Sequence, residues 1–206
     1  KSKNKQHLDE LNNQLNQKNR NYMSIAYDDV VNAQKAQGDV IRKTSLTFSD
    51  TFTEITGSTV YLKNEFEQKT GSFKLRGAYY KIKTLSTEER KKGVVAASAG
   101  NHAQGVAYAS ALEKINCTIV MPKSASPAKV AATRGYGATV VLDGKNYDEA
   151  WIRAQEIAKT TDATIIHAFD DSQIIAAQGV IGLEIIEQLP DVDEIYVPIG
   201  GGGLAA

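Results

Sequence analysis

The sequence predicts an α/β protein with open parallel sheets, and three observations support this fold class. Apolar runs at 93–98, 117–121 and 138–142 are too short for helices and have the composition of buried strands. Segments with helical periodicity separate these runs, and such alternation is typical of a parallel sheet covered by helices on both faces. Glycine-containing turns follow strand-like runs at 98–105 and 198–204, where open parallel sheets bind ligands.

Periodicity and boundary residues place the expected elements in order. Ser24 is the expected N-cap of the first helix and Gly38 its end, and Pro127 starts a later helix because proline is favoured at the first helical position. In helix 147–160 the side chains of Trp151, Ile152 and their apolar neighbours are expected to face the core. The expected elements are helix 24–37, a short helix 48–55, strand 59–63, helix 75–85, strand 93–98, helix 101–114, strand 117–121, helix 126–134, strand 138–142, helix 147–160, strand 164–168, helix 172–188 and strand 194–199.

Composition narrows the class of protein. The 206 residues include 24 basic and 24 acidic side chains, and 42% of the chain is hydrophobic. A net charge of zero gives no support for a nucleic-acid or membrane partner, and no apolar run has the length of a membrane span. Cys117 is the single cysteine, so it is expected as a small core residue rather than in an intrachain disulfide. We expect a cytoplasmic protein, because the N-terminus lacks the apolar core of a secretory signal, and we expect no metal site.

The predicted organisation has four parts. Residues 1–22 are a polar N-terminal arm, to which we assign no function, and residues 23–92 are the first part of a large domain. Residues 93–169 form a small α/β domain, and 170–206 begin the return to the large domain. The chain starts without methionine and ends where a loop should enter a helix, so we expect a fragment whose second sheet is incomplete.

A lysine in the stretch GSFKLRGA, residues 71–78, is the first candidate for chemistry. Lys74 falls at the expected start of a helix, where the positive local field favours a neutral amine. A neutral amine can form a Schiff base with an aldehyde cofactor. The spacing alone favours a different interpretation, a solvated lysine on the first turn of the helix.

Two further turns are candidate ligand sites. In the stretch SAGNHAQG, residues 98–105, backbone N–H groups at a helix start suit an anion such as a substrate carboxylate, although Ser98 or Asn101 could simply cap the helix. Four consecutive glycines at 200–203 allow backbone amides to converge on a phosphate. A flexible linker is the alternative interpretation of this glycine run.

In their residues and in their order along the chain, these three stretches resemble motifs of the pyridoxal-phosphate-dependent threonine dehydratases (threonine ammonia-lyases) and serine racemases. The resemblance implies the tryptophan-synthase-β-like fold (fold type II), covers only the N-terminal part of that family, and implies pyridoxal 5'-phosphate as cofactor. It makes Lys74 the catalytic residue that carries the cofactor. The implied cofactor-binding residues are Phe73, Lys74, Asn101, Gly200, Gly201, Gly202, Gly203 and Leu204, and the implied substrate-binding residues are Ser98, Ala99, Gly100, Asn101 and His102.

The segments 121–138 and 167–179 also resemble that family, so the likeness extends from about Ile41 to Ala206. The chain departs from the family's usual pattern at three positions. Ala168 replaces a proline, Ala177 a glycine and Val180 a threonine. These departures concern backbone shape and packing more than chemistry.

The resemblance implies α,β-elimination of L-threonine, and also of L-serine, to a 2-oxo acid and ammonia. Leu75 and His102 stand where sulfur-incorporating relatives carry other residues, and Ala99 stands where serine racemases place a serine. Elimination is therefore favoured over racemisation, with a serine racemase-like or other lyase activity as the alternative. A catalytically incomplete fragment or a cofactor-binding partner subunit is a further alternative. A nucleotide-binding module would leave Lys74 and Asn101 without a role. We also expect a homo-oligomer, a dimer or tetramer, acting on a small-molecule amino acid in isoleucine biosynthesis.

Overall fold

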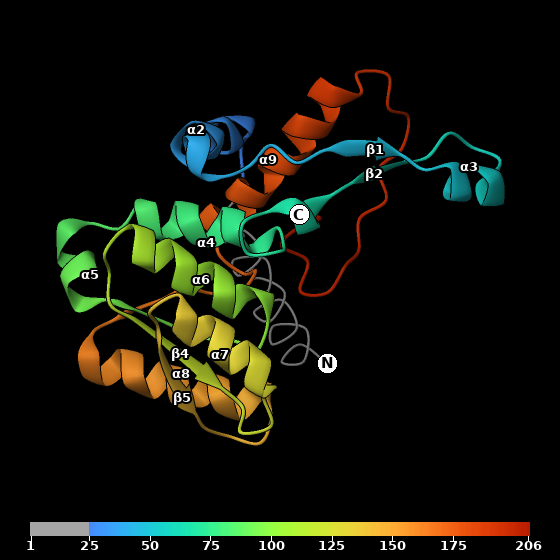
Figure 1. Cartoon of the computed structure of the whole chain (residues 1–206). Coiled ribbons are helices and arrows are strands. Elements are labelled where there is room, and N and C mark those ends of the chain that lie inside the picture. Colours follow the sequence, from blue (N-terminus) through green and yellow to red (C-terminus); the bar gives the residue numbers. More distant parts are fainter. Residues whose placement is uncertain (1–24) are drawn as a thin grey trace, which may run out of the picture.

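The computed structural model describes residues 25–206 (Figure 1). The predicted polar arm 1–22 and the expected N-cap Ser24 therefore lie outside the described residues. The first described helix, α2, comprises Tyr27–Gln37 and begins after Ala26, whose backbone N–H donates to the Asp29 carboxylate at 2.9 Å. It ends at Gly38, as predicted, where a φ of +45° favours glycine.

The order of the remaining elements follows the predicted alternation from β3 onwards. They are η1 (a 3₁₀ helix, Gly38–Val40), β1 (Leu46–Phe48), α3 (Asp50–Thr56), β2 (Tyr61–Lys63), η2 (Glu65–Glu67), α4 (Lys74–Lys83), α5 (Thr87–Lys92), β3 (Val94–Ala97), α6 (Asn101–Leu112), β4 (Cys117–Met121), α7 (Pro127–Gly135), β5 (Thr139–Leu142), α8 (Tyr147–Thr161), β6 (Thr164–Ile165) and α9 (Ser172–Gln188).

A four-stranded parallel sheet forms the centre of the fold, which confirms the α/β class. Its strand order is β5-β4-β3-β6, and Ala96 in β3 lies beside Ile119 in β4. All four residues of β3 are buried, because helices cover both faces of the sheet. The chain runs from β3 outward to β5 and then returns to place β6 on the other side of β3. The strand order therefore reverses between β3 and β6, and such a reversal leaves a crevice at the carboxyl ends of the two strands.

Helices α6 and α7 cover one face of the sheet and α8 covers the other. In α8, Ala150 and Ala154 are fully buried against Val95 and Val120 of the sheet. Ile152 does not face the core as predicted, since it is 56% exposed. The reason is geometric, because a residue two positions from Ala150 and from Ala154 points to the opposite side of a helix with 3.6 residues per turn.

Helix α4 forms a further layer between α6 and α9, and Figure 1 shows α4 lying along α6 on the side away from the sheet. Glycines allow the close approach on both sides. A Cβ on Gly105 of α6 would lie 3.2 Å from the Lys74 carbonyl carbon, and one on Gly77 of α4 would lie 2.9 Å from an Ile174 methyl group of α9. The first turn of α4 is therefore packed directly against α6.

Strands β1 and β2 pair antiparallel and carry α3 between them, and Figure 1 shows these elements extending away from the helices. Strand β1 was not predicted, and the short helix expected at 48–55 is α3, which starts after its N-cap Ser49 and ends at Gly57. Phe48 belongs to β1 and packs edge-to-face on Tyr61 of β2, with 5.7 Å between ring centroids.

The structure differs from the predicted elements in two further places, a predicted strand that is absent and a helix that was not predicted. The expected strand at 194–199 is absent, because a strand needs a neighbour to pair with and none of the strands described for residues 25–206 lies beside it. Helix α5 was not predicted, although Ser86 and Glu89 form a reciprocal capping box at its start. In the described part of the chain, no helix is long and apolar enough to cross a membrane.

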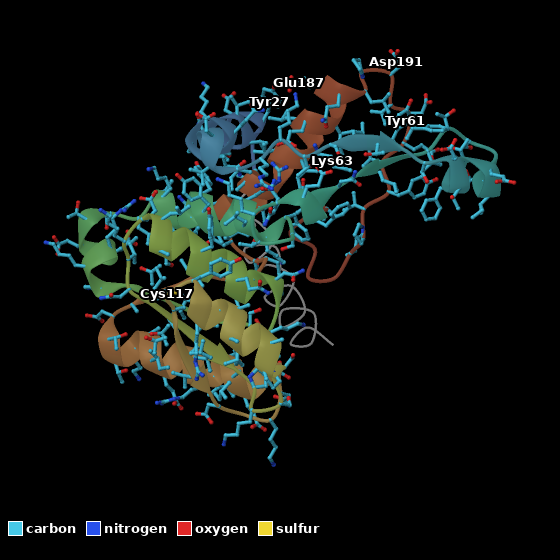
Figure 2. All side chains as sticks on the ribbon, in the orientation of Figure 1. Tyr27, Tyr61, Lys63, Cys117, Glu187 and Asp191 are labelled. Atoms are coloured by element: carbon cyan, nitrogen blue, oxygen red, sulfur yellow. The ribbon has the colours of Figure 1, made fainter. Side chains whose placement is uncertain are left out.

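A buried network of charges joins α4 to segments far away in the sequence. Arg76 is fully buried, and its guanidinium donates to Glu65 at 2.7 Å and to Glu184 of α9 at 2.6 Å. Lys63, labelled on β2 in Figure 2, donates to Glu184 at 2.6 Å. Burial alone would lower the pKa of Arg76, but hydrogen bonds with the two carboxylates raise that pKa above its ordinary value. The network thus contains two basic and two acidic side chains joined by hydrogen bonds, so that neither Arg76 nor Lys63 is buried without a carboxylate partner.

Candidate active site

Lys74 is the first residue of α4, one residue before the predicted start of this helix at 75, and its side chain is half-buried. Its ammonium donates to the carbonyl oxygen of Ala168 at 2.6 Å and lies 5.1 Å from the centre of the Phe73 ring. Within residues 25–206, Lys74 forms no ion pair, whereas Lys63 and Lys81 each pair with a carboxylate. Burial lowers the pKa of Lys74. This amine reaches its neutral form more readily than an exposed lysine does.

The contact with Ala168 places Lys74 at the reversal of strand order. Ala168 follows β6, and the stretch from Ser98 to Asn101 follows the neighbouring strand β3. The structure therefore brings the lysine and the predicted substrate loop to the same edge of the sheet. Ser98 accepts a hydrogen bond from the N–H of Gly100 at 3.2 Å, and α6 begins at Asn101 with an exposed side chain. The N–H groups of the first turn of a helix have no intrahelical partners and are suited to bind a carboxylate.

His102 lies next to this loop but is buried, with only 4% of its surface exposed. Its Nε2 atom is 2.9 Å from the carbonyl oxygen of Ile166, so Nε2 carries the proton that is donated to this acceptor. Burial lowers the pKa of His102 to about 4. The ring is therefore neutral at neutral pH and joins α6 to the end of β6, and only its backbone amide remains a candidate for binding substrate.

The glycine run contacts the segment that follows β6. A Cβ on Gly201 would lie 2.4 Å from the Phe169 ring, and one on Gly203 would lie 2.5 Å from the Phe169 carbonyl oxygen. Apart from the neighbouring residues in the chain, no atom of residues 25–206 lies within 4 Å of the corresponding positions at Gly200 and Gly202. Two glycines thus allow close packing, while the other two face open space that a phosphate group would fill.

The chain begins a helical turn after these glycines. The N–H of Ala206 donates to the carbonyl of Gly202 at 3.0 Å, and Leu204 lies half-buried within the turn. Gly202 has a φ of +87°, a conformation that a residue with a side chain adopts only under strain. A glycine loop that leads into a helix start is the arrangement expected of a phosphate cradle.

We expect Gly203→Ala to lower the free energy of unfolding of the protein by about 1–3 kcal/mol, which is the usual cost of overpacking. The added methyl group would meet backbone atoms of Phe169, which have no rotamer through which to move away. Gly200→Ala is the matched control in the same loop, and its expected effect is within about 0.5 kcal/mol. Urea unfolding of both variants without cofactor makes the comparison, and equal losses of stability would contradict this packing role for Gly203.

Two hydroxyl groups near Lys74 suggest a missing polar ligand. The Oγ1 atom of Thr70 and the Oγ atom of Ser72 are buried and have no hydrogen-bond partner in the described structure. Buried polar atoms without partners are uncommon in folded proteins and usually belong to a site for water, an ion or a ligand. With the glycine cradle and the half-buried amine, they fit a phosphate-bearing aldehyde cofactor.

Sequence reasoning missed the segment that organises these groups. The sequence placed His167, Ala168 and Phe169 only within a segment, 167–179, that resembles the family. In the structure the Ala168 carbonyl accepts a hydrogen bond from Lys74, and Phe169 packs against the glycines. No sequence signal identifies the Ala168 contact, because every residue has a backbone carbonyl. In the described residues, no cluster of histidine, cysteine, aspartate or glutamate is arranged to hold a metal ion.

The lysine, the loop after β3 and the glycine run form a candidate site of the kind found in cofactor-dependent amino-acid enzymes. Residues 38–206 match the family model described as pyridoxal-phosphate dependent enzyme. The chain belongs to this family, which confirms the resemblance seen in the sequence, and pyridoxal phosphate is the cofactor of the family.

Individual relatives agree with this family. The chain is 53% identical over 180 residues to an L-threonine ammonia-lyase of Thermotoga maritima, covering 87% of this chain and 45% of that protein. It is 47% identical over 184 residues to a catabolic L-threonine dehydratase of Escherichia coli K12, covering 89% of this chain and 56% of that protein. The structure of maize serine racemase matches with a TM-score of 0.83 at 35% identity, covering 86% of this chain and 54% of that one. The chain thus spans about half the length of these relatives.

Proposed function

We propose that the protein catalyses α,β-elimination of L-threonine, and also of L-serine, to a 2-oxo acid and ammonia with pyridoxal phosphate as cofactor. The observation that carries this proposal is the position of Lys74. Its amine lies at the reversal of strand order, 2.6 Å from the Ala168 carbonyl, on the segment whose next residue packs against the glycine run. The names of the bacterial relatives, a threonine ammonia-lyase and a threonine dehydratase, support the choice of substrate.

In this proposal Lys74 would hold the cofactor, and its Nζ atom would take the proton from the α-carbon of the substrate. Burial supports this role because it lowers the pKa of Lys74 and so favours the neutral amine that accepts a proton. The cofactor supplies a conjugated ring that stabilises the negative charge left on the α-carbon.

The other predicted site residues would bind and orient the substrate and the cofactor. The amides of the loop Ser98, Ala99, Gly100, Asn101 and His102 would bind the substrate carboxylate, and the Asn101 side chain would contact the cofactor ring. The glycine run 200–203 and Leu204 would hold the phosphate, where Gly200 and Gly202 face open space. Phe73 would exclude water beside the Lys74 amine, since its ring centre lies 5.1 Å from that nitrogen.

The direct test is to supply the purified protein with pyridoxal phosphate and L-threonine and to measure 2-oxobutyrate and ammonia. Equal amounts of the two products are expected from the L-isomer and none from D-threonine, because the carboxylate and the α-proton must meet the loop and Lys74 together. Cofactor binding without product formation from either L-threonine or L-serine would overturn the proposed reaction.

Ala99 favours elimination over racemisation, because its methyl group offers no acid or base to the face of the α-carbon opposite Lys74. We expect Ala99→Ser to raise the ratio of racemisation to elimination of L-serine by about a hundred-fold, the lower end of the range for a single general acid–base group. Chiral chromatography of serine and an assay of pyruvate give the two rates.

Ala131→Ser is the matched control for this substitution, since Ala131 lies exposed on α7. Its ratio of racemisation to elimination should equal that of the unchanged protein. An equal ratio in the Ala99→Ser protein would remove Ala99 as a determinant of the reaction. A high racemisation rate before any substitution would favour the serine racemase alternative, which the likeness to the maize enzyme supports.

The proposal also includes the predicted organisation, in which 23–92 and 170–206 belong to a large domain and 93–169 to a small one. It further includes a homo-oligomeric state, a cytoplasmic location and a role in isoleucine biosynthesis. The name of the Escherichia coli relative describes a catabolic enzyme, which favours threonine degradation as the alternative role. Loss of the gene should produce an isoleucine requirement in the first case and a growth defect on threonine in the second.

A further inference from the structure

The ring of His167 fixes the turn that follows β6. Its Nδ1 atom accepts hydrogen bonds from the backbone N–H groups of Phe169, at 3.2 Å, and Asp170, at 2.7 Å. The ring packs edge-to-face against Trp151 of α8, with centroids 5.2 Å apart, and against Phe169, with centroids 4.7 Å apart. Two hydrogen bonds and two aromatic contacts therefore set the orientation of this imidazole.

The peptide unit between Ala168 and Phe169 connects this ring to Lys74. Its N–H donates to Nδ1 of His167, and its carbonyl oxygen accepts from the Lys74 ammonium at 2.6 Å. A trans peptide is planar, so its N–H and C=O point in opposite directions. An acceptor that fixes the N–H of this unit therefore fixes the direction in which the carbonyl points.

The same turn supports the glycine run. Phe169 lies where a Cβ on Gly201 or Gly203 would overlap it, so the position of Phe169 limits where the loop can lie. Through the peptide unit on one side and the Phe169 ring on the other, the turn contacts both Lys74 and the glycine run.

The contact requires a neutral imidazole, because a protonated ring has no acceptor atom to offer. Burial lowers the pKa of His167 and the charge of Lys74 lowers it further, while Asp170 and Asp171 act in the opposite direction. The net shift is downward and keeps the ring neutral near neutral pH, with the proton on Nε2 and Nδ1 free to accept.

We propose that His167 is a positioning residue for Lys74. Its Nδ1 atom orients the 168–169 peptide, and the carbonyl of that peptide holds the Lys74 amine in its half-buried position. The inference rests on the proposed role of Lys74, but it concerns the cofactor-free protein and needs no turnover to be tested.

The experiment compares the unchanged protein with His167→Asn, His167→Gln and His167→Ala, all without cofactor. The asparagine oxygen is attached to Cγ, as Nδ1 is in histidine, so it can accept from the same N–H groups. The glutamine oxygen lies one bond further away and the alanine side chain has no acceptor. Trace acetylation at a series of pH values, followed by mass spectrometry of each lysine, measures the pKa of Lys74.

We expect the pKa of Lys74 to stay lowered in the unchanged protein and in His167→Asn. In His167→Gln and His167→Ala the pKa of Lys74 should rise towards the ordinary lysine value, because the released side chain reaches water. Lys91, an exposed residue of α5, is the internal control and should give one value throughout. Thermal unfolding checks that each variant folds, and the asparagine–glutamine pair decides the outcome if His167→Ala does not fold.

The inference would be overturned if the pKa of Lys74 were the same in the unchanged protein and in all folded variants. It would also be overturned if this pKa rose as much in His167→Asn as in His167→Gln. Failure of the unchanged protein to bind pyridoxal phosphate would instead refute the proposed function and leave the comparison of Lys74 values intact.

Discussion

The Lys74→Ala variant is expected to lose threonine turnover by about 10²–10⁴-fold from the missing proton transfer alone. It should also lose the visible absorption band that pyridoxal phosphate acquires when a lysine of the protein holds it. Both losses follow because Lys74 carries the only amine at the start of α4, beside the turn after β6 and without an ion-pair partner in the described structure. Absorbance titration with the cofactor and an assay of 2-oxobutyrate give the two measurements.

Lys123→Ala is the matched control for that experiment. Lys123 is an exposed lysine that follows β4 at the same edge of the sheet, with its amine 3.8 Å from Asp143. Removing it should leave absorbance and turnover unchanged. Borohydride reduction followed by peptide mapping should find the cofactor on Lys74 in the unchanged protein. A reduced cofactor found mainly on another lysine, or a full band in Lys74→Ala, would remove Lys74 from the proposed role.

The Glu184→Leu variant is expected to lower the free energy of unfolding by about 3–5 kcal/mol, the usual cost of breaking a buried ion pair from one side. Glu184 accepts from the Arg76 guanidinium at 2.6 and 2.9 Å and from the Lys63 ammonium at 2.6 Å. Its removal leaves two buried cations with the single carboxylate of Glu65. Urea unfolding monitored by circular dichroism measures the loss.

The exposed pair between Glu88 and Lys91 on α5 provides the comparison for this loss. We expect Glu88→Leu to change the stability by less than about 1 kcal/mol, since surface ion pairs contribute little. A double substitution of Arg76→Met with Glu184→Leu should recover part of the loss of the single variant, because it removes one uncompensated charge. Similar effects of Glu184→Leu and Glu88→Leu would show that the buried network contributes no more than a surface pair.

The parallel sheet could be predicted because its signals are local. Short valine- and isoleucine-rich runs separated by helical segments identified β3, β4 and β5 and the helices between them. The expected strand 194–199 was wrong because pairing depends on a neighbouring strand, which a single apolar run does not reveal. The exposed position of Ile152 shows a second limit, since an apolar residue within an amphipathic helix can lie on the side away from the core.

The candidate site could be predicted only in part. Three motifs were recognisable from their residues: the stretch around Lys74, the loop after β3 and the glycine run. In the structure, Lys74 contacts Ala168 and the glycine run contacts the next residue, Phe169. The contact between Lys74 and the Ala168 carbonyl could not be predicted, because every residue type has a backbone carbonyl. The network around Arg76 was missed for a related reason, because its carboxylates come from Glu65 and Glu184 and no local pattern connects the three.

The Arg76 network has a consequence for the order in which contacts form while the chain is being synthesised on the ribosome. Arg76 and Glu184 are 108 residues apart, so the guanidinium of the nascent chain lacks this carboxylate partner until α9 has been synthesised. The four strands of the sheet lie between Val94 and Ile165 and can associate before that point. The helix that begins with Lys74 therefore receives this support only after the strands of the sheet beneath it have been synthesised.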